Sequence, residues 1–242
     1  SIFREQFLKF NNYATDLDVE RELNNIKIEL DQNDLGRAFY NRIVSDSGPT
    51  YVDWENPENN TFHLALEVTC QNGGDEFRPD IVIFINGLPL SYIEVKQPNA
   101  IRDGKTAIQS EQSRTAVRFE NRRFRRFNNI TQLISFSDNL PYISGQGQQK
   151  QGSFYCSNAF SKTKFKAFKE EREEELIYSI RSLGEEEIDA VLKDVNRFAL
   201  KSQPEFKTNQ DPSTPCNTFI SSLYQKERLL FLLRYGLAYV EE

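Results

Sequence analysis

Two apolar runs joined at Asn86-Gly87 constrain the fold of this chain more than any other segment. In the first run, IVIFI, isoleucines alternate with valine and phenylalanine, so a strand here would be apolar on both faces. The second run, LPLSYIEV, leads away from the turn, and an Asn-Gly pair between apolar runs is typical of a hairpin. A strand that is apolar on both faces belongs inside a sheet with helices on either side. The sequence therefore predicts an α/β fold.

Other segments carry patterns that fit this fold. Helical spacing of apolar residues predicts one or two helices over residues 17–44 and another over residues 103–119. Alternation predicts a strand at Phe62–Val68, and a further apolar run predicts one at Ile130–Phe136. We therefore expect a mixed β-sheet core flanked by helices, which occupies residues 1–165.

The C-terminal part of the chain has a different character. Residues 166–200 have helical spacing and a strongly acidic face, and a polar, proline-containing segment follows at residues 202–215. A last helix is predicted over residues 221–240. We expect residues 166–242 to form a helical extension of the core.

Three charged residues stand at the ends of the hairpin strands. Asp80 opens the first strand, while Glu94 and Lys96 are two residues apart and so share one face of the second strand. With a two-residue loop and regular pairing, Glu94 would lie opposite Pro79. A bulge or a three-residue loop would instead bring Asp80 and Glu94 to the same side of the sheet.

Two carboxylates at neighbouring strand ends suit Mg²⁺, which takes one or two carboxylates and keeps several waters. Such an ion neutralises charge that develops on a phosphate and lowers the pKa of a bound water. Lys96, on the same face, would orient the attacking water or stabilise the charge on phosphorus. This pattern predicts hydrolysis of a phosphodiester. A buried Glu–Lys ion pair and exposed strand ends are the alternatives.

A positive block follows the hairpin in a chain whose net charge is −6. Residues 1–96 carry a net charge of −9, whereas residues 97–166 carry +8. Arginines in this block are interleaved with phenylalanines, and a guanidinium group can donate two parallel hydrogen bonds to a phosphate. We expect contact with double-stranded DNA from Arg114, Arg118, Arg122, Arg123, Arg125 and Arg126.

Residues 77–98 resemble the nuclease motif of the PD-(D/E)xK superfamily. The sequence RPDIVIFINGLPLSYIEVKQP resembles more closely the endonuclease domain of the motor (restriction) subunit of type I restriction enzymes. Its Arg-Pro-Asp, Asn-Gly-x-Pro and Glu-x-Lys elements occur in the order of that family. ITQLISFSDN resembles the family's later core strand and turn, and KERLLFLLRYGLAYVEE resembles its helical passage into the helicase motor.

The resemblance implies a restriction-endonuclease-like fold and specific roles for the charged residues. Asp80 and Glu94 would hold Mg²⁺, and Lys96 would be the catalytic lysine. Many relatives also carry a glutamine followed four residues later by tyrosine, but here Gln109 and Gln112 lack that tyrosine. Relatives also use an acidic residue of the first helix, for which the candidates are Glu20 and Glu22; a solvated helix face is the alternative.

These features and the resemblance together predict a Mg²⁺-dependent endonuclease domain that hydrolyses DNA, and the resemblance assigns it to a type I restriction-modification system. The resemblance further implies methylase and specificity subunits as partners, and ATP use by a motor outside this sequence, since no phosphate-binding loop is present. The alternatives are another nuclease of the superfamily, for repair or junction resolution, and a non-enzymatic DNA-binding or assembly module.

The remaining sequence features exclude other classes of protein. No apolar run approaches the length of a membrane helix, and the N-terminus does not resemble a signal peptide. The three cysteines are far apart and include no CxxC pair, so neither a disulfide framework nor a zinc site is expected. We expect a cytoplasmic protein that contacts no membrane.

Overall fold

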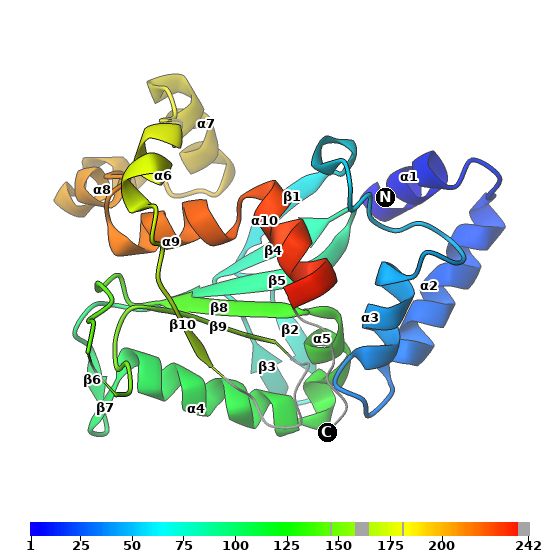
Figure 1. The fold of residues 1–242 in the computed structure, drawn as a ribbon, viewed down its shortest axis with the longest axis horizontal. Coiled ribbons are helices and arrows are strands. Elements are labelled where there is room, and N and C mark those ends of the chain that lie inside the picture. The colour runs from blue at the N-terminus through cyan, green and yellow to red at the C-terminus, as the bar shows by residue number, and fades with distance from the viewer. Residues whose placement is uncertain (146, 158–164, 181, 237–242) are drawn as a thin grey trace.

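The structure, a computed structural model, describes residues 1–145, 147–157, 165–180 and 182–236. Its centre is a six-stranded mixed sheet in the order β1-β4-β5-β8-β9-β10 (Figure 1). Among the described residues, β5 and β8 pair in parallel, and the other strand pairs of this sheet are antiparallel. The strands are β1 (Phe62–Leu66), β4 (Ile81–Ile85), β5 (Leu88–Val95), β8 (Leu133–Ser137), β9 (Ser153–Ser157) and β10 (Lys166–Phe168).

Helices cover both faces of this sheet, so the predicted mixed α/β fold is confirmed. One face packs against the N-terminal helices and against helices from the C-terminal part of the chain. These are α1 (Ile2–Phe10), α2 (Asp16–Leu30), α3 (Arg37–Val44), α9 (Pro215–Leu223) and α10 (Lys226–Phe231), which continues as the short π-helix η4 (Leu232–Gly236). Among the helices that the structure describes, none is long and apolar enough to cross a membrane.

The other face of the sheet packs against α4 (Ala107–Glu120), the 3-10 turn η2 (Arg122–Phe124) and α5 (Arg125–Ile130). Alternation along β5 decides which residues point to which layer. Ile93 belongs to the core under the N-terminal helices, whereas Tyr92 packs with Phe124 on the other face. Glu94, two residues after Tyr92, therefore points toward α4.

The predicted helix over residues 103–119 begins later than expected. Strands β6 (Ile101–Arg102) and β7 (Lys105–Thr106) form a small hairpin whose turn places Asp103 and Gly104 at positive φ. Helix α4 starts only at Ala107, because Thr106 caps it and Gln109 completes a capping box. The correction affects only this end of the helix.

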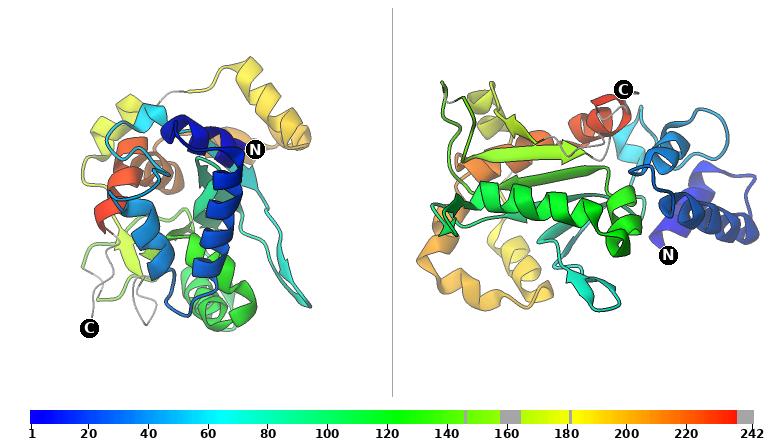
Figure 2. Two further views of the ribbon diagram at one scale, coloured as in Figure 1. Left: turned by 90° about the vertical axis from the view of Figure 1, so that its right-hand side faces the viewer. Right: turned by 90° about the horizontal axis from the view of Figure 1, so that it is seen from below.

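A second small hairpin projects from the sheet beside α4. It consists of β2 (Cys70–Asn72) and β3 (Asp75–Phe77), and Figure 2 shows it extending away from the main body. Two hydrogen bonds, each of 2.9 Å, connect its tip to η2 and the residue before it. The Asn72 side chain donates to the Arg123 carbonyl, and the Asn121 side chain donates to Asp75. Only a short segment separates β3 from Asp80.

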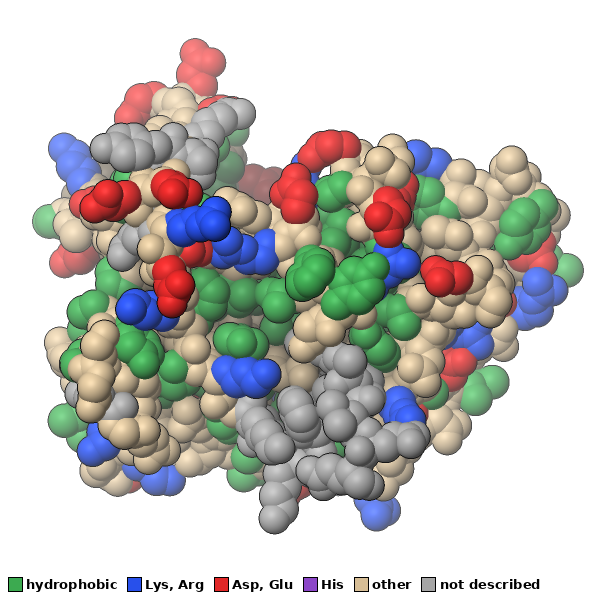
Figure 3. Space-filling view, viewed as in Figure 1, with side chains coloured by type: hydrophobic (Ala, Val, Ile, Leu, Met, Phe, Trp, Pro, Cys, Tyr) green, Lys and Arg blue, Asp and Glu red, His purple; other side chains and the backbone are tan. Residues whose placement is uncertain are grey.

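The predicted boundary after residue 165 falls just before β10, which forms the edge of the sheet. Phe219 and Leu230, from the predicted extension, belong to the main core. The predicted extension also contains α6 (Glu173–Ser179), α7 (Glu185–Asp194), η3 (Phe198–Ser202) and α8 (Pro204–Asn209). In the N-terminal part of the chain, the short 3-10 helix η1 (Pro57–Asn59) precedes β1. Acidic side chains gather over α6 and α7, as Figure 3 shows, which confirms the acidic character predicted there.

Candidate active site

The β4–β5 hairpin carries the residues that the sequence singled out, and its register is irregular. Next to the two-residue turn, Ile85 lies opposite Leu88. The register then shifts by one, so that Ile81 lies opposite Ile93 and Leu90 is an extra residue in β5. Of the two predicted alternatives, a bulge and a three-residue loop, the structure has the bulge.

This register, continued by one residue, places Asp80 opposite Glu94. Opposed residues of an antiparallel pair point to the same side of a sheet, so both carboxylates face the α4 layer. The backbone N–H of Val95 donates to Asp80 Oδ2 at 2.8 Å, which ties the aspartate to the end of β5. Asp80 is partly exposed, whereas Glu94 is only 3% exposed.

Lys96 joins the two carboxylates. Its ammonium donates to Glu94 Oε2, and its Nζ lies 4.0 Å from Asp80 Oδ2. The structure thus brings together all three residues that were predicted to form the catalytic set. Val95, which points to the opposite side, is exposed.

Glu111 on α4 is a further charged residue of this site, and sequence reasoning missed it. It is fully buried, with Oε2 at 3.2 Å from Lys96 Nζ and Oε1 at 2.9 Å from Arg118. A signal was present, because Ile108, Glu111 and Thr115 have the i, i+3, i+7 spacing of one helix face. All three are buried toward the sheet.

Arg118 belongs to the site as well as to the predicted DNA-binding group. Its side chain is only 12% exposed, and one guanidinium nitrogen lies 3.9 Å from Glu94 Oε1. The guanidinium carbon stacks 3.9 Å from the centre of the Phe77 ring, a cation–π arrangement. Arg118 therefore neutralises buried carboxylates and is held by the β3 aromatic ring.

The two buried glutamates have opposite pKa shifts. Burial raises the pKa of the Glu94 carboxyl, and the charge of Glu111 raises it further against the opposing effect of Lys96. Burial also acts to raise the pKa of Glu111, but the nearby charges of Lys96, Arg118 and Arg114 outweigh it, so this pKa is lowered. Glu111 is thus the more firmly ionised carboxylate of the pair.

The donor set fits Mg²⁺. Three buried side-chain polar atoms make no hydrogen bond in the described part of the chain, and two of them are Glu94 Oε1 and Glu111 Oε2. Glu111 Oε2 has the charged groups of Lys96 and Arg114 beside it, whereas Glu94 Oε1 is a buried oxygen that a hard cation would satisfy. No group of three or more His, Cys, Asp or Glu residues suited to a metal occurs among the described residues. Mg²⁺ needs no such group, because it keeps several waters.

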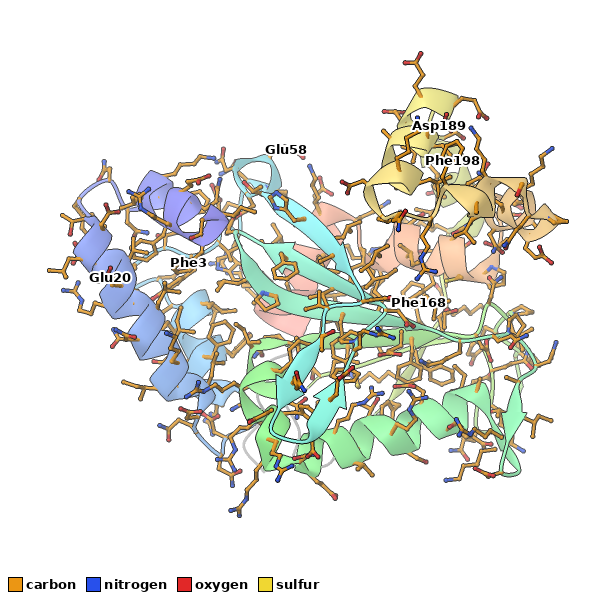
Figure 4. All side chains as sticks on the ribbon, turned by 180° about the vertical axis from the view of Figure 1, so that it is seen from behind. Phe3, Glu20, Glu58, Phe168, Asp189 and Phe198 are labelled. Carbon is orange, nitrogen blue, oxygen red and sulfur yellow. The ribbon has the colours of Figure 1, made fainter. Side chains whose placement is uncertain are left out.

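The other predicted site residues lie outside this cluster. Gln109 accepts from the Thr106 backbone N–H at 3.1 Å and so caps α4, while Gln112 is half-buried on the same helix. Glu20 is exposed on α2 (Figure 4). Glu22 is buried but accepts hydrogen bonds from Tyr51 and Arg42, at 2.6 and 2.9 Å, within the N-terminal helical layer.

The remaining arginines of the positive block are mostly exposed, and several are paired. Arg126 donates two hydrogen bonds to Asp31, each of 2.7 Å, and Arg123 lies 3.2 Å from Asp75. Arg125 donates to the Asp31 carbonyl at 3.2 Å. Arg122 and Arg114 are also exposed, and Arg114 lies 3.6 Å from Glu111.

An open groove adjoins the cluster, between the β2–β3 hairpin and α4. Phe77, Arg78 and Arg114 line it, as does Arg118, which contacts Glu111 of the cluster. The other lining residues are Glu76, Ser113, Val117 and Phe124. Most of the charge in this groove is therefore positive.

Comparison with known proteins gives one family and two relatives. Residues 1–174 match the family described as type I restriction enzyme R protein N terminus. One relative is named the type I restriction enzyme MjaIXP endonuclease subunit of Methanocaldococcus jannaschii, and it is 28% identical over 99 residues, which are 39% of this chain and 9% of that protein. The MjaVIIIP endonuclease subunit of the same organism is 30% identical over 120 residues, which are 50% of this chain and 11% of that protein. The match thus spans about a tenth of each relative.

Proposed function

Because the chain belongs to the family of type I restriction enzyme R protein N termini, we propose that it is a Mg²⁺-dependent endonuclease domain that hydrolyses phosphodiester bonds of double-stranded DNA. The observation that carries this proposal is the convergence of Asp80, Glu94 and Lys96 at one end of the β4–β5 hairpin. Their chemistry is that of a hard-cation site with an ammonium group beside it.

The cation would be held by Asp80 and Glu94. A bound Mg²⁺ would neutralise charge that develops on the phosphate and would lower the pKa of a coordinated water. Lys96 would hold the attacking water or a phosphate oxygen by donating a hydrogen bond. Arg118 and Glu111 lie behind this set and keep it in place through the 2.9 Å contact between them.

DNA would reach the site along the groove between the β2–β3 hairpin and α4. Arg78 and Arg114 stand on its walls with side chains 54% and 52% exposed, so phosphates can reach their guanidinium groups. The exposed arginines of η2 and α5 extend this positive surface. Phosphate contacts of this kind position a duplex without reading its sequence, so site recognition would come from a separate specificity subunit.

We infer that methylase and specificity subunits and an ATP-driven motor region complete the enzyme. The relatives are named endonuclease subunits of type I restriction enzymes and are about ten times longer than the matched stretches. ATP hydrolysis would belong to the motor region, because this sequence has no phosphate-binding loop.

The proposal is tested with the complete restriction complex and circular DNA that carries its recognition sites. Asp80→Ala, Glu94→Ala and Lys96→Ala should each abolish cleavage, while ATP hydrolysis by the complex continues. Glu58→Ala is the matched control, since Glu58 is exposed and pairs with Lys226 on another part of the surface. Cleavage at the wild-type rate by any of the three variants would remove that residue from the mechanism.

A further inference from the structure

Lys96 has more than one anionic partner. Its ammonium donates to Glu94 Oε2, but Glu111 Oε2 lies only 3.2 Å from the same nitrogen and Asp80 Oδ2 lies 4.0 Å away. The Lys96 side chain is 16% exposed, so little water is available to replace a lost partner. The lysine therefore has two buried carboxylates within contact distance and uses one of them for its hydrogen bond.

Glu111 has one carboxylate oxygen, Oε2, that accepts no hydrogen bond. Its Oε1 accepts from Arg118 at 2.9 Å and from the Thr115 hydroxyl at 3.3 Å. Its Oε2 makes ion-pair contacts with Lys96 and Arg114 but no hydrogen bond. The carboxylate is thus fixed at one oxygen, while the other is buried next to the lysine and able to accept from it.

The present partner of Lys96 is the residue that a cation would also need. Glu94 is the buried carboxylate of the proposed Mg²⁺ pair, and an ammonium group bound to its Oε2 lies next to the Oε1 that would hold the cation. Like charges also repel, so an ammonium held at Glu94 opposes cation binding there. A nearby second anion removes this conflict because it gives the lysine another position.

We propose that Glu111 is a positioning residue that accepts the Lys96 ammonium when Glu94 engages a divalent cation. The proposal rests on the metal-dependent function above and adds a role for the α4 carboxylate. A small shift of the ammonium, from Glu94 Oε2 to Glu111 Oε2, would suffice. Lys96 would then stay beside the reacting phosphate and no longer compete for Glu94.

Two other roles for Glu111 make different predictions. If Glu111 bound the cation itself, its removal would weaken cation binding whether or not Lys96 were present. If Glu111 served only as the counter-ion of Arg118, its removal would lower stability without changing cation affinity. A double-mutant cycle with Lys96 separates the three roles, because it measures whether the effect of one residue depends on the other.

The experiment is calorimetric titration of Mg²⁺ into the 242-residue chain and its variants, with thermal melts as the check of folding. Glu111→Gln, which keeps the size of the side chain, should weaken Mg²⁺ binding about 10-fold, the effect typical of residues that support a metal ligand. Lys96→Met should strengthen binding, because it removes the competitor. Glu111→Gln in the Lys96→Met background should then change the Mg²⁺ affinity less than about 2-fold. The effect nearly disappears there because Glu111 acts on the cation through Lys96.

Each other outcome overturns the proposal. An equal loss in both backgrounds means that Glu111 acts on the cation directly, and no loss in either means a structural role only. If Lys96→Met does not melt cooperatively, Lys96→Gln takes its place, since it too lacks the charge. Asp80→Ala separates a failure of the proposed role of Glu111 from a failure of the metal site. Mg²⁺ binding that Asp80→Ala abolishes supports the metal site whatever the cycle gives. A wild-type chain that binds no Mg²⁺ overturns both.

Discussion

Asn86, at the turn of the catalytic hairpin, offers a quantitative test of how the site is positioned. Its side chain is 1% exposed and makes three hydrogen bonds. It accepts from the Thr61 backbone N–H at 2.8 Å and donates to the Tyr51 carbonyl at 2.9 Å and to Asn60 Oδ1 at 2.7 Å. These bonds join the turn to the segment that connects α3 with β1.

Asn86→Ala should lower the free energy of unfolding by about 4 kcal/mol. Three lost hydrogen bonds contribute about 3 kcal/mol at about 1 kcal/mol each. Asn86 also has φ of +52°, and alanine in this left-handed region adds about 1 kcal/mol. For a chain of this size the loss lowers the melting temperature by roughly 10 °C.

Asn86→Gly is the matched variant, because glycine loses the same hydrogen bonds but tolerates positive φ. It should retain about 1 kcal/mol more stability than Asn86→Ala. Urea unfolding followed by circular dichroism measures both values. A loss below about 1 kcal/mol for Asn86→Ala, or a glycine variant less stable than the alanine variant, would refute the reasoning, since three bonds of this kind are together worth more.

Gly87→Ala should destabilise the chain by more than about 2 kcal/mol in urea unfolding, because the new Cβ would lie 2.6 Å from the Phe3 backbone nitrogen. Gly48 also has positive φ, but a Cβ there meets nothing within 4 Å, so Gly48→Ala should lose less stability. Burial raises the pKa of Glu94 in the folded chain. The carboxyl therefore contributes to the free energy of unfolding below the pKa of an unfolded glutamate, and this stabilisation is lost as pH rises through the folded pKa. Glu94→Gln should therefore raise the melting temperature of the metal-free chain at about pH 8 and not at about pH 4, and equal melting temperatures at pH 8 would contradict this. Serine in place of Arg122, Arg123, Arg125 and Arg126 should flatten the salt dependence of DNA binding by up to about 0.9 per lost phosphate contact, and an unchanged slope in titrations would mean that DNA lies over another surface.

The catalytic hairpin could be predicted from sequence because its constraints are local. Apolar residues on both faces of IVIFI required a covered sheet, and the side-chain parity required a bulge if Asp80 and Glu94 were to share a side. The bulge at Leu90 meets that requirement. The identity of the extra residue could not be predicted, because it depends on how β5 packs between β4 and β8.

The contribution of α4 was harder to predict because it depends on helical phase and on partners distant in sequence. The spacing places Glu111 on the same face of α4 as Ile108, but its partners Lys96 and Arg118 follow only from the fold. Arg118 was grouped with surface arginines, but the Phe77 ring and two glutamates hold it in the interior. Strand β10 pairs with β9, but no pattern in the local sequence indicates this pairing. The extent of the sheet beyond residue 165 therefore could not be inferred.

The most direct test of the account is to locate a divalent cation in crystals of the 242-residue chain. Crystals soaked in Mn²⁺, which replaces Mg²⁺ and gives an anomalous signal, should show one strong peak within about 2.2 Å of a carboxylate oxygen of both Asp80 and Glu94. In the same crystals the Lys96 ammonium should donate a hydrogen bond to Glu111 Oε2 and no longer to Glu94 Oε2. A peak that contacts neither carboxylate, or none at Mn²⁺ concentrations that support DNA cleavage by the complete enzyme, would contradict the proposed site.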